Sequence, residues 1–254
     1  MVLAGVVARG GGPRTVRECG ERSRARMPQL IIAIDGPSGA GKGTVARAVA
    51  AHLRYRHVDT GAMYRAVAWK ARQAGLDLMD ADVVAAVARD AAIDLDGHVA
   101  IDGHDVTGAI RTPDIDVAAA TVARHPAVRA ALVARQRRYG EVGGLVMEGR
   151  DIGTVVFPQA DVKVYLDASP EERARRRKGD AAHAASRESS GATVAEALEA
   201  RDHADRTRTI SPLVVAPDAT YIDTTGLPVE EVVRRVIRLT EQRLHQLKAG
   251  VRKQ

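Results

Sequence analysis

LIIAIDGPSGAGKGT, residues 30–44, joins an apolar run to a glycine-rich segment that contains one lysine. The apolar run predicts a strand. Gly36, Gly39 and Gly41 allow the backbone to bend and to point successive N–H groups at an anion. A helix that begins near Lys42 adds the positive end of its dipole and an ammonium group. The stretch therefore predicts a strand, a phosphate-binding loop and a helix, in that order.

The end of this loop differs from the general pattern G-x-x-x-x-G-K-[ST], because Gly43 follows the lysine and Thr44 stands one position later. We expect Lys42 to contact the β- and γ-phosphates of a nucleotide, and the Thr44 hydroxyl to bind the accompanying Mg²⁺. The G-K-G-T ending resembles nucleoside monophosphate kinases more than GTPases or motor ATPases. A glycine-rich turn without a ligand is the alternative, but strand, loop, lysine, threonine and helix occur together here.

Composition limits the class of protein. With 254 residues, 45% apolar and 28% charged, the chain is long enough for one sizeable α/β domain with an insertion. Its apolar runs are far shorter than the roughly twenty residues that cross a bilayer, so we expect no membrane span. The single cysteine, Cys19, excludes an internal disulfide framework and a cysteine-based zinc site. It is typical of a reducing compartment, and we predict a cytoplasmic protein.

Most of the positive charge lies at the start of the chain. Residues 1–26 contain six arginines and two glutamates, which supply +4 of the net charge of +6. This segment lacks periodicity and the apolar residues needed for packing, so we expect a disordered leader over residues 1–27. Met27 directly precedes the first strand, which favours a leader that is dispensable or untranslated. The remaining chain is weakly basic and poor in aromatic residues, which argues against nucleic-acid binding.

The stretch HVDTGAMYR, residues 57–65, predicts a short strand, a turn and a helix with Asp59 or Thr60 as its N-cap. Arg65 lies just over one turn into that helix, where its guanidinium can bind a second phosphate. The motif D-T-G is weak alone, and such an arginine is ordinarily solvated. Because the motif follows a phosphate-binding loop, we interpret it as part of an acceptor phosphate site.

Residues 76–108 differ in character from the chain around them. Within them, residues 91–107 alternate apolar and polar side chains around two Asp-Gly turns, which predicts small antiparallel strands in an inserted subdomain. Helical sequence resumes over Asp114–Arg124, stops before Pro126 and continues over Val128–Tyr139.

The sequence EGRD, residues 148–151, follows a predicted strand over residues 144–147. Its charged groups therefore lie at the C-terminal end of a strand, where ligands bind in open α/β sheets. Asp151 is placed to accept a hydrogen bond from an acceptor hydroxyl or a metal-bound water, and Arg150 to hold phosphate. A surface pair between these two residues is the alternative, but their position favours a functional role. Strands over 161–167 and 219–223 and a helix from Pro228 to about Leu247 complete the expected domain.

An arginine-rich stretch over residues 173–178 precedes an Ala/Ser/Gly-rich segment that extends to Ala192. A predicted helix follows from Thr193 toward Arg208, with three of its charged residues on one face. Such a run is ordinarily a solvated helix face. Beside a flexible segment and opposite a phosphate-binding loop, it predicts a lid that brings arginines to the transferring phosphoryl group and excludes water. The arginines of the run are Arg173, Arg175, Arg176 and Arg177, and the face consists of Arg201, Asp205 and Arg208.

The chain resembles bacterial cytidylate kinases over roughly residues 28–248. The resemblance rests on motifs in the family's order and spacing: D-G-P-S-G-A-G-K-G-T at 35–44, D-T-G-A-M-Y-R at 59–65, I-R-T-P at 110–113, E-G-R-D-I-G-T-V-V-F-P at 148–158, L-D-A-S-P-E-E-R at 166–173 and R-D-x-x-D-R-x-R at 201–208. It implies an α/β, three-layer P-loop fold with a central parallel sheet. It also implies Mg²⁺-dependent transfer of phosphate from ATP to CMP or dCMP. We expect a leader over 1–27, core segments over 28–75, 109–172 and 193–254, a CMP-binding insertion over 76–108 and a lid over 173–192.

The resemblance also implies roles for individual residues. ATP would be bound by Gly36, Pro37, Ser38, Gly39, Ala40, Gly41, Lys42, Gly43 and Thr44. The nucleoside monophosphate would be held by Thr60, Arg65, Arg129 and Arg150, with Asp151, Asp205 and Arg208 at its base or sugar. Arg176, Arg177 and Arg201 would bind phosphates from the lid side. The catalytic set would be Lys42, Arg150, Asp151, Arg176 and Arg177.

Two positions differ from the usual family pattern. Ala120, followed by Thr121, stands where a serine usually contacts the cytosine, and Glu148 stands where an aspartate is common. Other acceptors, UMP, AMP or shikimate, are alternatives within the same donor chemistry. A regulatory or nucleic-acid-associated ATPase that uses the arginine-rich leader is an alternative of another class. We expect a monomer whose partners are small-molecule substrates, without nucleic acid or membrane.

Overall fold

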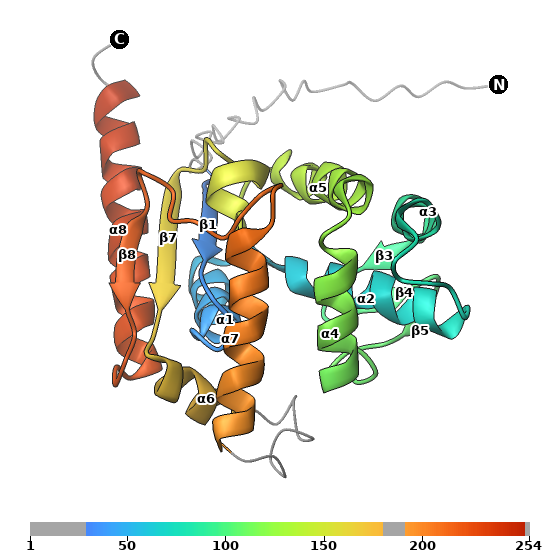
Figure 1. The fold of residues 1–254 in the computed structure, drawn as a ribbon. Coiled ribbons are helices and arrows are strands. Elements are labelled where there is room, and N and C mark those ends of the chain that lie inside the picture. Colours follow the sequence, from blue (N-terminus) through green and yellow to red (C-terminus); the bar gives the residue numbers. More distant parts are fainter. Residues whose placement is uncertain (1–28, 180–190, 252–254) are drawn as a thin grey trace, which may run out of the picture.

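The structure is a computed structural model that describes residues 29–179 and 191–251. The predicted leader and the Ala/Ser/Gly-rich part of the predicted lid lie outside these residues. Figure 1 shows a central sheet with helices around it and a second group of helices beside it. The predicted α/β fold with a central parallel sheet is confirmed.

Within the described residues, five parallel strands form the central sheet in the order β2-β6-β1-β7-β8. The strand that precedes the phosphate-binding loop, β1, lies in the middle and pairs with β6 and β7. Because the strands are parallel, their C-terminal ends meet at one edge, where the loop and Arg150 emerge. The strands are β1 (Ile31–Asp35), β2 (Arg56–Asp59), β6 (Leu145–Gly149), β7 (Val162–Asp167) and β8 (Thr220–Asp223).

Alternate residues of β1 point to opposite faces of the sheet. Ile32 and Ile34 share one buried cluster with α1 (Lys42–Leu53) and α8 (Val229–Val251). Ala33 belongs to another cluster on the opposite face. That face is covered by α5 (Pro126–Gly140) and by η1 (Ile152–Val156), a π-helical turn that the sequence analysis did not anticipate.

The group of elements beside the sheet begins directly after β2. Its helices α2, α3 and α4 pack on one another and on α5 around a cluster of small and branched apolar side chains. The predicted antiparallel strands are present as β3, β4 and β5, each two residues long. The helix α3 was not predicted. The elements are α2 (Thr60–Gln73), α3 (Ala81–Asp90), β3 (Ile93–Asp94), β4 (Ala100–Ile101), β5 (His104–Asp105) and α4 (Pro113–Val122).

The helices α6 (Pro170–Gly179) and α7 (Gly191–Thr207) pack against each other, with Ala174, Val194 and Leu198 buried between them. In Figure 1, α7 runs between the sheet and α4. The arginine-rich stretch therefore lies on a regular helix at the edge of the sheet. Over residues 29–179 and 191–251, no helix is both long and apolar enough to span a membrane.

Candidate active site

A cleft of about 760 Å³ opens at the C-terminal edge of the central sheet. Its walls come from the glycine-rich loop, from α2 and α4, from the end of β6, from α6 and α7, and from the segment before α8. All residues predicted for the site line this cleft except Gly36 and Pro37. The fold therefore brings the predicted ATP-binding loop and the predicted acceptor residues to one continuous space.

Gly36 and Pro37 set the backbone conformation of the loop without contributing to the cleft wall. Gly36 has a φ of 146°, and a Cβ at this position would lie 1.9 Å from the carbonyl oxygen of Leu166 in β7. Only glycine lets the chain leave β1 so close to the neighbouring strand. Pro37 presents its carbonyl oxygen to Lys42, whose Nζ donates a hydrogen bond to it at 2.7 Å. The two residues thus set the form of the loop without lining the cleft.

The helix α1 begins where an anion would sit. Gly41, with a φ of 90°, occupies the N-cap position and makes no side-chain capping bond. The N–H groups of the first turn are therefore left for a ligand, and the helix dipole favours a negative one. Thr44 lies in this turn and lines the cleft.

Lys42 is the one lysine that lines the cleft among the described residues. Its side chain is buried. Burial, together with the nearby charge of Arg150, lowers the pKa of Lys42 from 10.5 to about 7. Neutral and charged forms of Lys42 therefore coexist near pH 7, and an anionic phosphate would favour the charged form.

Asp59 orients two arginines on the acceptor side of the cleft. One oxygen accepts a hydrogen bond from the backbone N–H of Ala62 at 3.0 Å, so Asp59 is the N-cap of α2. The other oxygen accepts from Arg65 at 2.9 Å and from Arg111 at 3.2 Å. Burial alone would raise the pKa of Asp59, but the two guanidinium charges outweigh burial and hold the pKa below its usual range.

A second network joins the residues after β6 to α7 and α5. Arg129 pairs with Asp151, and both are buried. Arg208 lies 3.9 Å from the other oxygen of Asp151 and 3.3 Å from Asp205. Asp205 also accepts a hydrogen bond from Arg150 Nε at 2.9 Å. Arg150 and Asp151 have separate partners and both line the cleft, so the alternative of a surface pair between them is wrong.

The pKa values in this network follow from its charges. Burial would lower the pKa of Arg150, but the carboxylates of Asp205 and Asp202 outweigh it and raise that pKa. Burial would likewise raise the pKa of Asp205, but the charges of Arg150 and Arg208 hold it below its usual range. Both residues are therefore ionised at neutral pH.

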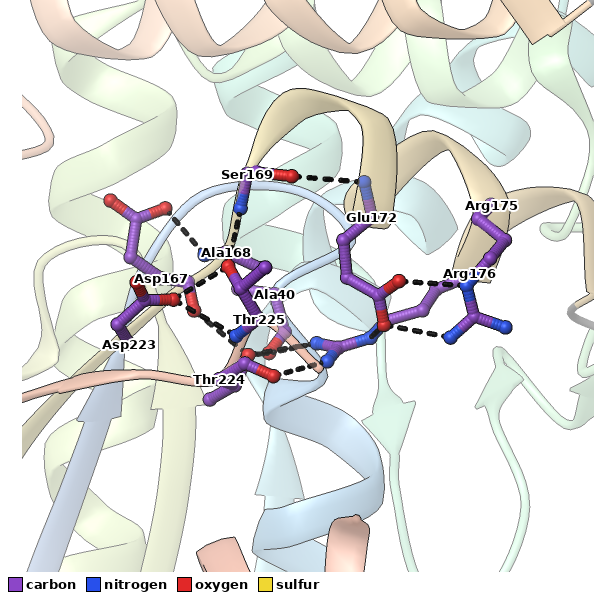
Figure 2. Close-up of polar contacts among 10 residues, drawn as sticks. All are labelled: Ala40, Asp167, Ala168, Ser169, Glu172, Arg175, Arg176, Asp223, Thr224 and Thr225. Carbon is purple, nitrogen blue, oxygen red and sulfur yellow. Dashed lines mark hydrogen bonds and ion pairs between the residues drawn. The ribbon is translucent and has the colours of Figure 1, made fainter. Parts of the chain in front are cut away.

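Arg176 closes the donor end of the cleft from α6. Figure 2 shows its guanidinium between the loop and the residues that follow β8. One NH group donates to Thr224 Oγ1 at 2.8 Å and to the carbonyl oxygen of Ala40 at 3.3 Å. Nε donates to Glu172 at 2.7 Å. The neighbouring Arg175 also pairs with Glu172, at 2.7 Å, but its side chain is exposed.

The other arginines of the arginine-rich run and of the lid side have distinct positions. Arg177 and Arg201 both face Asp116 of α4, at 3.7 Å and 2.9 Å. Their guanidinium groups therefore lie where α6 and α7 approach the acceptor side. Arg173 differs from the prediction, because it is buried behind the loop, outside the cleft, where it pairs with Asp202.

Sequence reasoning gave no role to Arg111, Asp116 or Asp35. Arg111 lies in the motif I-R-T-P, residues 110–113, so the resemblance could have identified it as a site residue. No motif around Asp116 distinguishes it from an ordinary acidic residue of a helix. Asp35 ends β1 and accepts hydrogen bonds from the backbone N–H groups of Ile152 and Gly153 at 2.8 and 2.7 Å. Burial raises the pKa of Asp35 from 3.8 to about 6. This carboxylate fixes η1 against the start of the loop.

Ala120 lines the cleft from α4 and offers it no polar atom. The hydroxyl of Thr121 does not replace the missing one, because it donates to the carbonyl oxygen of Val117 at 3.2 Å on its own helix. Thr60 does present a hydroxyl to the cleft, and this hydroxyl donates to the carbonyl oxygen of Glu148 at 2.7 Å.

A protein-family model and curated relatives of this chain point to the same family. The family model described as cytidylate kinase matches residues 32–242. The cytidylate kinase of Desulfitobacterium hafniense (strain Y51) is 49% identical over 214 residues, which cover 83% of this chain and 92% of that protein. The cytidylate kinase of Solibacter usitatus (strain Ellin6076) is 46% identical over 226 residues, which cover 86% of this chain and 95% of that protein. The chain therefore belongs to the cytidylate kinase family.

Proposed function

We propose that this chain transfers the γ-phosphoryl group of ATP to CMP or dCMP, releasing ADP and CDP or dCDP. The observation that carries the proposal is the single cleft that joins the glycine-rich loop to the acceptor arginines. Phosphoryl transfer needs little covalent chemistry from the protein. It needs two substrates held in line and the charge of the migrating group neutralised.

On the acceptor side, Arg65 and Arg150 hold the phosphate of the monophosphate. Arg65 is oriented by Asp59 and Arg150 by Asp205, so both guanidinium groups are fixed before a substrate binds. Asp151 takes part in orienting the sugar or base. A phosphate oxygen is already ionised at neutral pH, so the attacking group needs no strong general base.

On the donor side, the loop amides, Lys42 and the lid arginines bind the triphosphate. Mg²⁺ is usually held by one or two protein oxygens and by phosphate oxygens. The Thr44 hydroxyl fits this role, and the buried carboxylate of Glu148 lies 3.0 Å from the position that a Cβ would take at Gly43. When bound, Mg²⁺ would neutralise charge on the transferring phosphoryl group.

The division into parts fits the same proposal. The core supplies the loop and the segment 148–151, and the insertion over residues 76–108 supports the acceptor helices. The helices α6 and α7 bring arginines from the lid side. We propose that the chain acts as a monomer, since one chain supplies every residue named above. We also propose that it acts in the cytoplasm, since its single cysteine is typical of a reducing compartment.

The test is release of ADP from Mg-ATP by the purified full chain, with CMP, dCMP, UMP, AMP or shikimate in one coupled assay. We expect turnover with CMP and dCMP at higher kcat/KM than with the other acceptors. A preference for another acceptor would leave a kinase but contradict the substrate. Turnover that does not depend on any acceptor, and that is lost when residues 1–26 are deleted, would favour the regulatory ATPase.

A further inference from the structure

Ser38 of the glycine-rich loop is held by three side chains from three different elements. Its backbone N–H donates to Asp202 of α7 at 2.9 Å. Its carbonyl oxygen accepts from Arg173 of α6 at 3.2 Å. Its hydroxyl accepts from Arg150, at the end of β6, at 2.8 Å. Ser38 is thus the residue where the donor loop, the lid helices and the acceptor arginine meet.

Arg173 and Asp202 have no place in the cleft. Their side chains are 3% and 0% exposed, and they pair with each other behind the loop. A buried ion pair is often no more stabilising than apolar side chains of similar volume, so stability alone is a weak reason to place one there. What this pair does in the structure is to bond both backbone polar groups of Ser38.

Arg150 connects the same serine to the acceptor side. Its Nη2 donates to Ser38 Oγ, while its Nε donates to Asp205 at 2.9 Å. Among the described residues, its Nη1 makes only a long bond, at 3.5 Å, to the carbonyl oxygen of Gly149, and the side chain lines the cleft. A displacement of the loop that moves Ser38 would change where Arg150 lies, and a displacement of Arg150 would act on the loop.

We propose that Arg173 and Asp202 are positioning residues, and that Ser38 couples the two substrate sites, so that ATP and CMP each strengthen the binding of the other. This inference rests on the proposed function. ATP fixes the loop, the loop fixes Ser38, and Ser38 fixes the guanidinium that receives the phosphate of CMP. The effect must be reciprocal, because two ligands that share one coupling free energy change each other's affinity by the same factor.

The primary test removes the hydroxyl alone with Ser38→Ala. Calorimetry would measure the Kd of the full chain for CMP, without and with a saturating non-hydrolysable ATP analogue, Mg-AMPPNP. We expect the wild-type ratio of the two Kd values to be about 5 or more, which is the lower end for coupled sites, and the Ser38→Ala ratio to fall to about 1. The matched control is Thr207→Ala, which removes an exposed hydroxyl that donates to His203 on α7 and should keep the wild-type ratio.

A second variant, Asp202→Asn, keeps an oxygen that can accept from the Ser38 N–H but removes the charge opposite Arg173. We expect it also to lower the ratio, with melting temperature measured in parallel to verify folding. Folded variants with weaker binding of both ligands and an unchanged ratio would assign the pair a merely structural role and overturn the inference. A wild-type ratio of 1 would overturn it as well. A wild-type chain that binds no CMP would instead overturn the proposed function on which the inference rests.

Discussion

The donor and acceptor sides of the cleft are built in opposite ways. The donor side is built on one contiguous loop whose anion-binding groups are mostly backbone amides at the start of α1, and Lys42 is the one basic residue within that loop, residues 36–44. The acceptor side is assembled from side chains of α2, α4, α5, α7 and the end of β6. Each of its arginines has a carboxylate partner, whereas Lys42, among the residues that the structure describes, bonds to a backbone carbonyl and to no carboxylate.

This difference has an electrostatic consequence. Carboxylates orient the acceptor arginines, so that side is pre-organised for an anion before one arrives. Lys42 is desolvated without a carboxylate bonded to it, and its pKa falls to about 7. The donor side therefore gains its full positive charge only with a phosphate present, and mutations on the two sides should affect different kinetic constants.

The largest effect is expected from Lys42→Ala. The ammonium contacts phosphates whose charge shifts in the transition state, so its loss should lower kcat by about 100- to 1,000-fold, as is typical when one pre-organised donor is removed. The KM for CMP should change little. Steady-state kinetics in the coupled ADP assay would check this, with Lys70→Ala, which breaks a surface pair with Asp102, as the control. A normal kcat in Lys42→Ala would remove the lysine from the catalytic set.

A smaller effect, on the KM for CMP rather than on kcat, is expected from Arg65→Ala. This change removes a charge-assisted contact to the acceptor phosphate, which corresponds to an increase of about 10- to 100-fold in the KM for CMP. The KM for ATP should remain near the wild-type value, because Arg65 lies on α2, where it is bonded to Asp59, and is not part of the glycine-rich loop.

Arg72→Ala is a suitable control for that measurement. Arg72 lies on the same helix, but its side chain is 44% exposed and faces Asp114 at 3.9 Å. An unchanged KM for CMP in Arg65→Ala would contradict the assignment of Arg65 to the acceptor phosphate.

The contrast between the two sides also explains what the sequence could predict. The loop is recognisable because its chemistry needs glycines, a lysine and a helix start at fixed spacing within nine residues, from Gly36 to Thr44. The strands β1 and β6 could be predicted for a similar reason, since each is a short and mostly apolar run, whereas the parallel arrangement of the sheet was implied by the resemblance. On the acceptor side, Arg65, Arg150 and Asp151 could be proposed from their positions after predicted strands. Arg129 could be assigned only through resemblance to a family, because its partner Asp151 is distant in sequence.

The features that were not predicted correctly from the sequence are Arg173, α3 and η1. Arg173 looked like one more lid arginine, and only packing of α6 against α7 shows that it is buried with Asp202. The helix α3 does have local signals, namely Asp80 as its N-cap and Val84, Ala85 and Ala88 buried at helical spacing, but it is short and was not predicted. The π-helical turn η1 depends on hydrogen bonds from its backbone to Asp35, 117 and 118 residues earlier in the chain, which no local pattern reveals.

The pH dependence of ATP binding tests the electrostatic difference between the two sides. Lys42 has a lowered pKa of about 7 in the free chain, and a bound phosphate would raise it. ATP binding then takes up a proton above pH 7, so affinity falls as pH rises, by about fivefold between pH 7 and pH 8 if the pKa in the complex exceeds about 9. Calorimetry of Mg-AMPPNP in buffers of different ionisation enthalpy would measure the proton uptake.

The variant Lys42→Met is the control, because it has no group that titrates in this range. It should bind the analogue weakly and without the proton uptake. CMP binding should lack this dependence in the wild-type chain above pH 7, since its arginines are charged throughout. A pH profile of ATP affinity that is flat from pH 7 to pH 8 would contradict the lowered pKa of Lys42.

The smallest effect is expected from Ala120→Ser, which adds a hydroxyl to an apolar patch of the cleft wall. One neutral hydrogen bond to the base would lower the Kd for CMP by about 2- to 10-fold. Thr121→Ala is the matched control and should leave the Kd unchanged, because the Thr121 hydroxyl already donates to Val117 within α4. Equal affinities in Ala120→Ser and the wild-type chain would show that the base lies away from Ala120. Recognition would then rest on the charged groups Arg129, Asp151 and Arg208, which the fold already holds in one network.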